Sequence, residues 1–229
     1  MNLSSRQCEY LKLMGIDVWV SREQLLPVDY DDPITSEAFV DNSGMDEWQT
    51  LRKQVSGCQK CSLHQGRTQT VFGAGDIHAD WMIIGEAPGA EEDRKGEPFV
   101  GRAGKLLTAM LQAIGLDRNK VFITNILKCR PPSNRDPRLE EVAACESYLM
   151  RQIALVKPKI ILAVGRIAAQ NLLKTDTPIG KMRGRDYEFS EMKIPVVVTY
   201  HPAYLLRSPK EKRKSLQDLQ RAVDIYRQG

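Results

Sequence analysis

The stretch WMIIGEAPG, residues 81–89, combines two features that together indicate the fold class. Its first half, Trp81 to Ile84, is a short uninterrupted apolar run, the pattern of a strand buried on both faces of a parallel sheet. Its second half contains two glycines and a proline, which end a strand and form a turn. The stretch therefore predicts a buried strand whose carboxyl end leads directly into a polar turn.

Three more runs of the same kind lie further along the chain, at Val121 to Ile126, Ile160 to Val164 and Pro195 to Thr199. Between the first two of these, Leu139 to Val156 carries apolar residues at spacings of three and four, as one face of a helix requires. Strands that alternate with helices are typical of a parallel sheet covered on both sides. We therefore predict an α/β protein.

Three of the predicted strands end in polar or turn-forming residues, namely GEAPG at 85–89, TN at 124–125 and HPA at 201–203. The carboxyl ends of parallel strands meet at one edge of a sheet, and ligands bind at that edge. Taken alone, the glycine turn has the composition of an ordinary connecting loop with a solvated acidic patch. Three such ends at one edge favour a ligand site, where glycine lets the backbone approach the ligand closely.

Length and composition are those of a globular protein. The 229 residues, 42% of them hydrophobic, are enough for one sizeable core with an appended segment. No apolar window approaches eighteen residues, and no basic region followed by an apolar stretch opens the chain. We therefore expect neither a membrane span nor a secretory signal, and we expect a cytoplasmic protein.

The net charge of +4 is divided unevenly along the chain. Residues 1–50 carry ten Asp and Glu against three Lys and Arg, a net charge of −7, which leaves +11 on residues 51–229. A body this basic favours a polyanionic partner such as nucleic acid, although a solvated basic surface explains the same numbers. We interpret residues 1–48 as a partly disordered acidic arm that docks on a partner protein, and residues 49–229 as the body. A helix of the arm packed on the body is an equally open alternative.

Four of the five cysteines form two pairs, Cys58 with Cys61 as C-x2-C, and Cys129 with Cys145. Disulfides are rare in a cytoplasmic protein, so this spacing favours a metal centre, either zinc or iron–sulfur. Cys129 and Cys145 also fit ordinary buried thiols, but Cys129 follows a predicted strand among polar residues. Sixty-seven residues separate Cys61 from Cys129, too many for a compact zinc finger. Such a centre would join the start of the body to its middle.

Five motifs in a fixed order give the chain a family resemblance. They are GEAPGAEED (85–93), GEPFVGRAG (96–104), TNILKCRPPSNR (124–135), HPAYLLR (201–207) and the four cysteines. From about Gln49 to its C-terminus the chain resembles the family 4 uracil-DNA glycosylases, which carry an iron–sulfur cluster. The resemblance implies a three-layer α/β/α sandwich with a short, mainly parallel sheet. It also implies a monofunctional hydrolase of base excision repair, which releases uracil from DNA and leaves an abasic site.

The resemblance implies which residues bind the base. A glycosylase flips its target into a pocket that stacks on the base and reads its edge. By resemblance, Phe99 is the stacking aromatic and Asn125 pairs with O4 and N3 of uracil. His201 donates a hydrogen bond to O2, where negative charge develops as the bond breaks, and backbone amides from Gly85 to Ala87 assist it.

Two carboxylates are also assigned by resemblance. Glu86 positions the attacking water, although the better-known uracil glycosylases use an aspartate one position later, where this chain has Ala87. Glu92 lines the part of the pocket where the methyl group of thymine would lie, and so excludes thymine by shape. Asn134, in the third motif, supports the site.

The last motif and several cations are assigned to DNA. Leu205, Leu206 and Arg207 form a loop that enters the helix where the base has left, with an apolar wedge in the stack and a cation at the phosphates. We expect a monomer that binds uracil-containing DNA, single- or double-stranded. Further backbone contacts are expected from Lys105, Arg130, Arg135 and Arg183.

The cysteines are assigned by resemblance to a [4Fe-4S] cluster, with zinc as the less favoured metal. Two other classes of protein share some of these features. One is a non-catalytic DNA-binding relative that keeps the fold and the cluster, which the joint presence of Phe99, Asn125 and His201 opposes. The other is a zinc-stapled protein whose ligand is not DNA, which the +11 body opposes. Absorbance near roughly 400 nm distinguishes iron–sulfur from colourless zinc.

Overall fold

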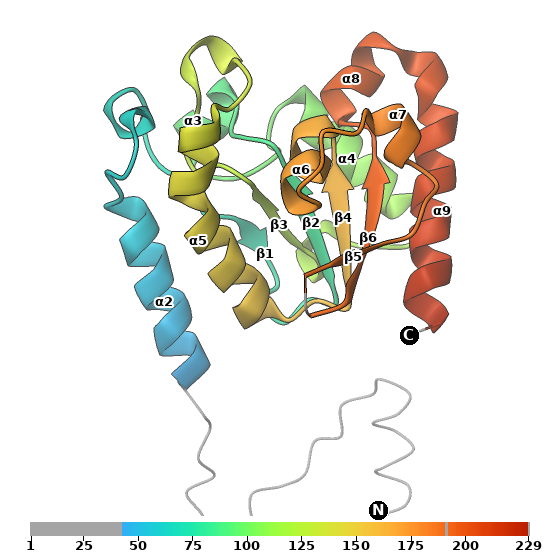
Figure 1. Cartoon of the computed structure of the whole chain (residues 1–229), viewed down its shortest axis with the longest axis horizontal. Helices are drawn as coiled ribbons and strands as arrows, with labels where there is room; N and C mark the ends of the chain where they lie inside the picture. The colour runs from blue at the N-terminus through green and yellow to red at the C-terminus, as the bar shows by residue number, and fades with distance from the viewer. Residues whose placement is uncertain (1–42, 191, 229) are drawn as a thin grey trace, which may run out of the picture. The chain divides into compact units, whose positions relative to one another are not determined.

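The computed structural model describes residues 43–190 and 192–228, drawn in colour in Figure 1. The arm predicted at residues 1–48 lies almost wholly outside these ranges, so its boundary and its docking role stay predictions. Helix α2, Ser43–Ser56, runs across the predicted boundary at residue 48. The ring of Trp48, on this helix, lies 5.1 Å from the rings of both Phe72 and Phe122.

A single mixed sheet forms the centre of the described part of the chain, in the strand order β1-β3-β2-β4-β6-β5. Strand β2 pairs in parallel with β3 and β4, and β4 pairs in parallel with β6, while β1 and β5 are antiparallel edge strands. The sheet is therefore mainly parallel, as predicted. The strands are β1 (Ala74–Gly75), β2 (Trp81–Gly85), β3 (Phe122–Asn125), β4 (Ile160–Val164), β5 (Tyr187–Phe189) and β6 (Ile194–Thr199).

Helices cover both faces of this sheet (Figure 1). Alternate residues of β2 point to opposite sides, as in any strand. Met82 and Ile84 pack with buried residues of α2, α5 and α6, whereas Trp81 and Ile83 pack with buried residues of α4, α8 and α9. The three-layer α/β/α sandwich is therefore confirmed. The remaining helices are α3 (Ala90–Lys95), α4 (Arg102–Gln112), α5 (Leu139–Val156), α6 (Arg166–Leu172), α7 (Ile179–Met182), α8 (Pro202–Arg207) and α9 (Lys212–Gln228). Short 3-10 turns are η2 (Ser62–Gln65), η3 (Arg118–Lys120), η4 (Pro132–Asn134) and η5 (Pro209–Glu211).

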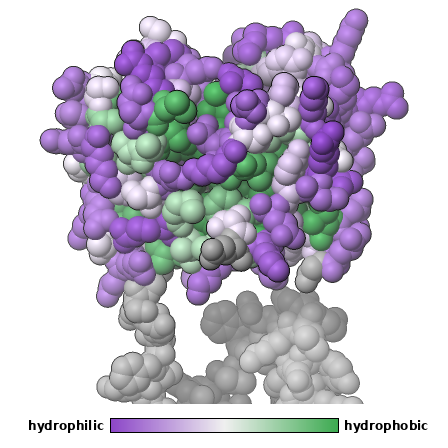
Figure 2. All heavy atoms as spheres, in the orientation of Figure 1, coloured by the Kyte–Doolittle hydropathy of each residue, from purple (hydrophilic) through white to green (hydrophobic). Residues whose placement is uncertain are grey.

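An apolar hollow opens on the face drawn in Figure 2, between α5, α6 and β5. Its volume is about 450 Å³, and its lining includes Leu149, Leu172 and Phe189. None of the residues predicted for the functional site lines it. Among the described residues, the helices are too short or too polar to cross a membrane.

Candidate active site

A second cavity of about 450 Å³ lies where the carboxyl ends of β2, β3 and β6 meet. Parallel strands bring these ends together although they are far apart in the sequence. The structure thus places the predicted base-binding residues around one space, except Gly85, which lies directly before the lining residue Glu86. Its lining includes Glu86, Ala87, Glu92, Phe99, Asn125, Asn134, Arg135, Asp136, His201 and Arg207.

Asn125 is the last residue of β3 and is only 2% exposed. Its side-chain Oδ1 is buried, and among the described residues it has no hydrogen-bond partner. Burying an amide oxygen without a partner costs roughly 1–3 kcal/mol, so such atoms are rare unless a ligand satisfies them. A donor on a bound ligand would therefore be held firmly at this point.

Gly85 makes room for this amide. It ends β2 directly opposite Asn125 in the parallel register. A Cβ at position 85 would overlap Asn125 Oδ1 and lie only 2.5 Å from Phe99 Cζ. The turn after Gly85 is fixed against the segment that follows β3, because Ile126 N donates to Gly85 O and Leu127 N donates to Glu86 O, both at 3.0 Å.

Phe99 is held in a conformation that phenylalanine rarely adopts. Its φ of 52° lies in the left-handed region, which disfavours residues with a bulky side chain. The ring is 7% exposed, and its centroid lies 5.6 Å from that of His201, with the ring planes 32° apart. The two rings therefore form adjacent walls of the cavity.

Glu92, at the start of α3, holds the loop that carries Phe99. Its Oε1 accepts hydrogen bonds from Val100 N at 3.0 Å and from Gly101 N at 3.2 Å. Two amide donors on one carboxylate form a strong, charge-assisted clamp. Glu92 therefore lines the cavity and also fixes the backbone next to Phe99, a second role that the sequence did not suggest.

His201 sits between the end of β6 and the first turn of α8. Its Nδ1 accepts a hydrogen bond from Ala203 N at 3.1 Å, so the proton of the neutral ring lies on Nε2. Burial, and then the positive charge of Arg207, lower the pKa of His201 to about 4, against a smaller opposing effect of Glu92. At neutral pH the ring is uncharged, and Nε2 is a hydrogen-bond donor.

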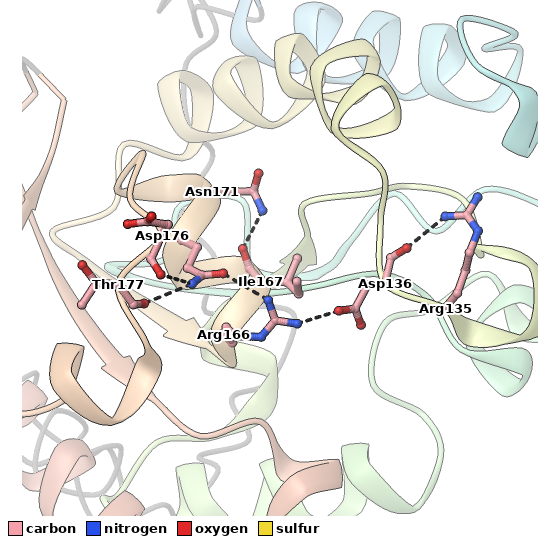
Figure 3. A network of polar contacts seen from close by, with 8 residues as sticks. Arg135, Asp136, Arg166, Ile167, Asn171, Asp176 and Thr177 are labelled. Atoms are coloured by element: carbon pink, nitrogen blue, oxygen red, sulfur yellow. Dashed lines mark hydrogen bonds and ion pairs between the residues drawn. The ribbon is translucent and has the colours of Figure 1, made fainter.

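Glu86 follows β2, and its pKa is raised, whereas that of His201 is lowered. Burial, and then the negative charge of Asp136, raise the pKa of Glu86 to about 7, and Arg166 partly offsets this. Asp136 is itself ion-paired with Arg166, with 2.5 Å between Oδ2 and Nη2 (Figure 3). Glu86 therefore changes its charge near neutral pH.

The HPAYLLR stretch differs from its prediction. Residues 202–207 form a short helix, α8, because Pro202 starts the helix and the ring of His201 caps it. Leu205 is 1% exposed and packs in the core beneath α4 and α9, so its assignment to an apolar wedge is wrong. Leu206, which is 36% exposed, and the exposed Arg207 remain on the surface.

The other predicted DNA contacts fall into two groups. Lys105 and Arg130 are partly or fully exposed, although Arg130 Nε donates to Asn134 Oδ1 at 2.8 Å. Arg135 has fewer free donors, because both of its Nη atoms bind Glu141, at 2.5 and 2.9 Å. Arg183 is 11% exposed and is paired with the buried Asp218, which leaves it little access to a phosphate.

All four predicted cysteines line one small cavity away from the strand ends. They are free thiols contributed by α5, the segment after β3 and the region around η2. Burial raises the pKa of Cys129, and it raises the pKa of Cys145 to about 11. Four thiols around one small cavity, two of them buried, are a suitable donor set for a cationic group, which would hold them as thiolates.

Three of the sulfur atoms each accept a hydrogen bond from one N–H group. Arg67 Nη1 donates to Cys129 Sγ at 3.1 Å, Lys128 N to Cys145 Sγ at 3.3 Å, and Lys60 N to Cys58 Sγ at 3.5 Å. Such N–H···S bonds stabilise thiolates that bind a metal. The residues present therefore fit a group that requires four thiolates.

In the described ranges, 43–190 and 192–228, no three His, Cys, Asp or Glu side chains are arranged to hold a metal ion.

Lys128 is a site residue that the sequence did not reveal. It is 1% exposed, and its Nζ donates to Thr124 Oγ1, Asn125 O and Gln152 Oε1 at 2.6, 2.7 and 2.6 Å. All three donors of the ammonium are thus satisfied, and one of them fixes the backbone of Asn125. A lysine after a strand normally indicates a solvated end, so no sequence signal marked it.

Comparisons with known proteins give a consistent result. The profile of the uracil DNA glycosylase superfamily matches residues 72–222. The chain is 45% identical to the type-4 uracil-DNA glycosylase of Archaeoglobus fulgidus, over 79% of this chain and 94% of that protein. It is 45% identical to the type-4 enzyme of Sulfurisphaera tokodaii, over 79% and 86%, and 41% identical to that of Thermotoga maritima, over 77% and 93%.

Proposed function

Because this chain belongs to the uracil-DNA glycosylase superfamily, we propose that the cavity at the strand ends binds a uracil flipped out of DNA. The enzyme hydrolyses the N-glycosidic bond of deoxyuridine, which releases uracil and leaves an abasic site. The observation that carries the assignment of the site is the buried, unpartnered Oδ1 of Asn125 in the same cavity as the neutral ring of His201. An acceptor and a donor at these positions match the N3–H and the O2 of uracil.

Asn125 would read the Watson–Crick edge. Its Oδ1 accepts from N3–H, and its amide NH2 donates to O4. Cytosine presents an acceptor at N3 and a donor at N4. In the same pose its N3 would meet the acceptor Oδ1, and its N4 amino group would meet the donor NH2. The preference for uracil requires that the amide keeps this orientation, with Phe99 stacked on the base.

His201 would stabilise the leaving group. As the glycosidic bond breaks, negative charge accumulates on uracil and positive character on the sugar. The Nε2–H of the neutral ring donates to O2, assisted by backbone amides at Gly85 to Ala87. A donor fixed in advance in a poorly solvated cavity typically contributes roughly 10²- to 10³-fold in rate.

Glu86 would position and activate the attacking water. A carboxylate whose pKa is raised to about 7 is a stronger base than a solvated one, and it is still ionised above that pH. Its charge also favours the positive sugar that forms during the reaction. Glu92 would exclude the methyl group of thymine while it holds the Phe99 loop, and Asn134 would support the rim.

Cys58, Cys61, Cys129 and Cys145 would hold a [4Fe-4S] cluster. When bound, it would supply a covalent link between the region around η2, the segment after β3 and helix α5. Zinc remains the less favoured metal. A monomer acting on single- or double-stranded DNA, a protein partner for residues 1–48 and a cytoplasmic location all stay predictions.

The test of the function is excision from an oligonucleotide with one deoxyuridine, followed by alkaline cleavage under single-turnover conditions. We expect Asn125→Ala and His201→Ala each to slow excision roughly 100-fold or more. Asn119→Ala and His78→Ala, at exposed positions of the same residue types, should stay within about twofold of the wild type. If the wild-type protein shows its cluster absorbance and binds the oligonucleotide but releases no uracil, it is the non-catalytic relative instead.

The cluster has a separate test. Cys145→Ser should lose the absorbance near roughly 400 nm and lower the melting temperature. A colourless wild-type protein that contains stoichiometric zinc would overturn the assignment of iron and sulfur.

A further inference from the structure

An ion pair at the rim of the cavity is not explained by base binding. Asp136 lines the cavity, and its Oδ2 lies 2.5 Å from Nη2 of Arg166, the first residue of α6. The side chains are 64% and 48% exposed, so the pair contributes little to stability. Because Asp136 lines the same cavity as Glu86, its charge lies where it can act on the groups of the site.

Further hydrogen bonds hold both members of the pair, as Figure 3 shows. Arg166 Nη1 donates to Gln170 Oε1 at 3.3 Å, and Gln170 Nε2 donates to the carbonyl oxygens of Asp176 and Thr177 at 2.9 and 3.1 Å. On the other side, Arg135 Nη1 donates to the carbonyl oxygen of Asp136 at 3.0 Å.

Arg135 is fixed in turn by Glu141, a buried residue in the first turn of α5. The pair therefore joins α6 to the segment before α5, with Asp136 in the lining of the cavity and Arg166 directly bound to it. Arg166 is thus held, through Gln170, by the segment that follows α6. The backbone of Asp136 is held by Arg135, which binds Glu141 of α5.

The charges that act on Glu86 are those of this pair. Burial is the largest cause of its raised pKa; Asp136, which lines the same cavity from the segment before α5, raises the pKa further, whereas Arg166 of α6 lowers it. The other ionisable groups of the lining are Glu92, Arg135, His201, Tyr204 and Arg207. His201 has a pKa of about 4 and therefore stays neutral over the range in which Glu86 titrates.

We propose that Asp136 and Arg166 are positioning residues for uracil excision, which adjust, in addition to the effect of burial, the pH at which Glu86 becomes ionised and so shift the acid limit of activity. This inference rests on the proposed role of Glu86. Asp136 keeps Glu86 a strong base by repelling its ionised form, and Arg166 limits that repulsion so that the base is still ionised near neutral pH. Neither side chain needs to touch the uracil.

The inference makes opposite predictions for the two partners. Asp136→Asn removes the repulsion, so the acid limb of the pH–rate profile should move to lower pH by roughly half to one unit. Arg166→Gln removes the attraction, so the limb should move to higher pH. The double variant should lie between the two single ones, and Arg166→Lys should retain the wild-type limb.

The measurement is the single-turnover excision rate of the full-length, cluster-containing enzyme at saturating concentration, from pH 5 to 9. Arg151→Gln is the matched control, since it removes a partly exposed arginine from α5 outside the cavity. Its limb should coincide with that of the wild type. Higher salt should reduce both shifts, because both charges are solvent-accessible.

The variant Glu86→Gln separates the two levels of the argument. If it keeps the wild-type acid limb, the role of Glu86 itself is wrong. If it loses the limb while Asp136→Asn and Arg166→Gln change only the plateau rate, or move the limb in the same direction, Glu86 stands and the inference about the pair is overturned.

Discussion

Contacts on both sides of its peptide hold Asn125, and the glycine opposite its amide leaves room for the side chain. Lys128 binds its carbonyl oxygen, β2 pairs with its backbone, and Gly85 leaves the volume in which Oδ1 lies. In the proposed mechanism, discrimination between uracil and cytosine therefore depends also on the residues that position Asn125.

Gly85→Ala tests this dependence. The added methyl group must displace Asn125 Oδ1 and the ring of Phe99, so we expect excision to fall at least tenfold. Overpacking of this kind should cost roughly 1–3 kcal/mol of the free energy of unfolding. Gly66→Ala is the matched control, because nothing lies within 4 Å of its added Cβ. Equal excision by the two variants would contradict the tight fit at residue 85.

Lys128→Met tests the support of the Asn125 backbone. The change removes three buried hydrogen bonds, including the one from Nζ to Asn125 O, at a cost of roughly 2–4 kcal/mol in urea denaturation. We expect the KM for the deoxyuridine oligonucleotide to rise as well. Lys53→Met, on the exposed face of α2, should change neither quantity. A variant that is destabilised with an unchanged KM would reduce Lys128 to a core residue.

At the scale of elements, the Phe99 loop is held in a strained backbone conformation by a neighbouring helix. Glu92 of α3 binds two successive amides of that loop. We expect Glu92→Ala to release the loop and raise KM several-fold, with Glu92→Gln intermediate because its amide oxygen can still accept. Glu91→Ala, one residue earlier and exposed, is the control. If Glu92→Ala and Glu91→Ala have the same KM, the clamp does not position Phe99.

The four central strands and α5 were predictable because each is a continuous apolar run or a regular helical pattern. The edge strands β1 and β5 were not, since they are only two and three residues long and pair on one side. The loop predicted at 201–207 is a helix, because the capping by the His201 ring cannot be seen in a list of residues.

The residues of the candidate site were predictable to a similar extent. Asn125, Phe99 and His201 were identified through the motifs that contain them. Lys128 and Asp136 were not, because a buried lysine and a paired aspartate have the same letters as solvated ones. Only their partners in space distinguish them.

At the scale of the whole molecule, the first 42 residues differ from the rest of the chain in the sign of their net charge. Residues 1–42 hold eight Asp and Glu and three Lys and Arg, a net charge of −5 in a chain of +4. We expect their deletion to tighten binding to a deoxyuridine oligonucleotide, measured by fluorescence anisotropy, and to steepen its dependence on salt. An affinity that is unchanged across salt concentrations would show that this acidic segment does not compete with DNA.

The position of His201 at the end of β6 has a consequence for the making of the protein. Strand β6 is the last of the parallel strands to leave the ribosome, and it pairs with β4 near the centre of the sheet. A nascent chain that stops before residue 201 carries Phe99 and Asn125 but lacks the histidine that we propose as the donor to O2. We therefore expect uracil excision to begin only after almost the whole protein has been synthesised, and truncated translation products to add little glycosylase activity.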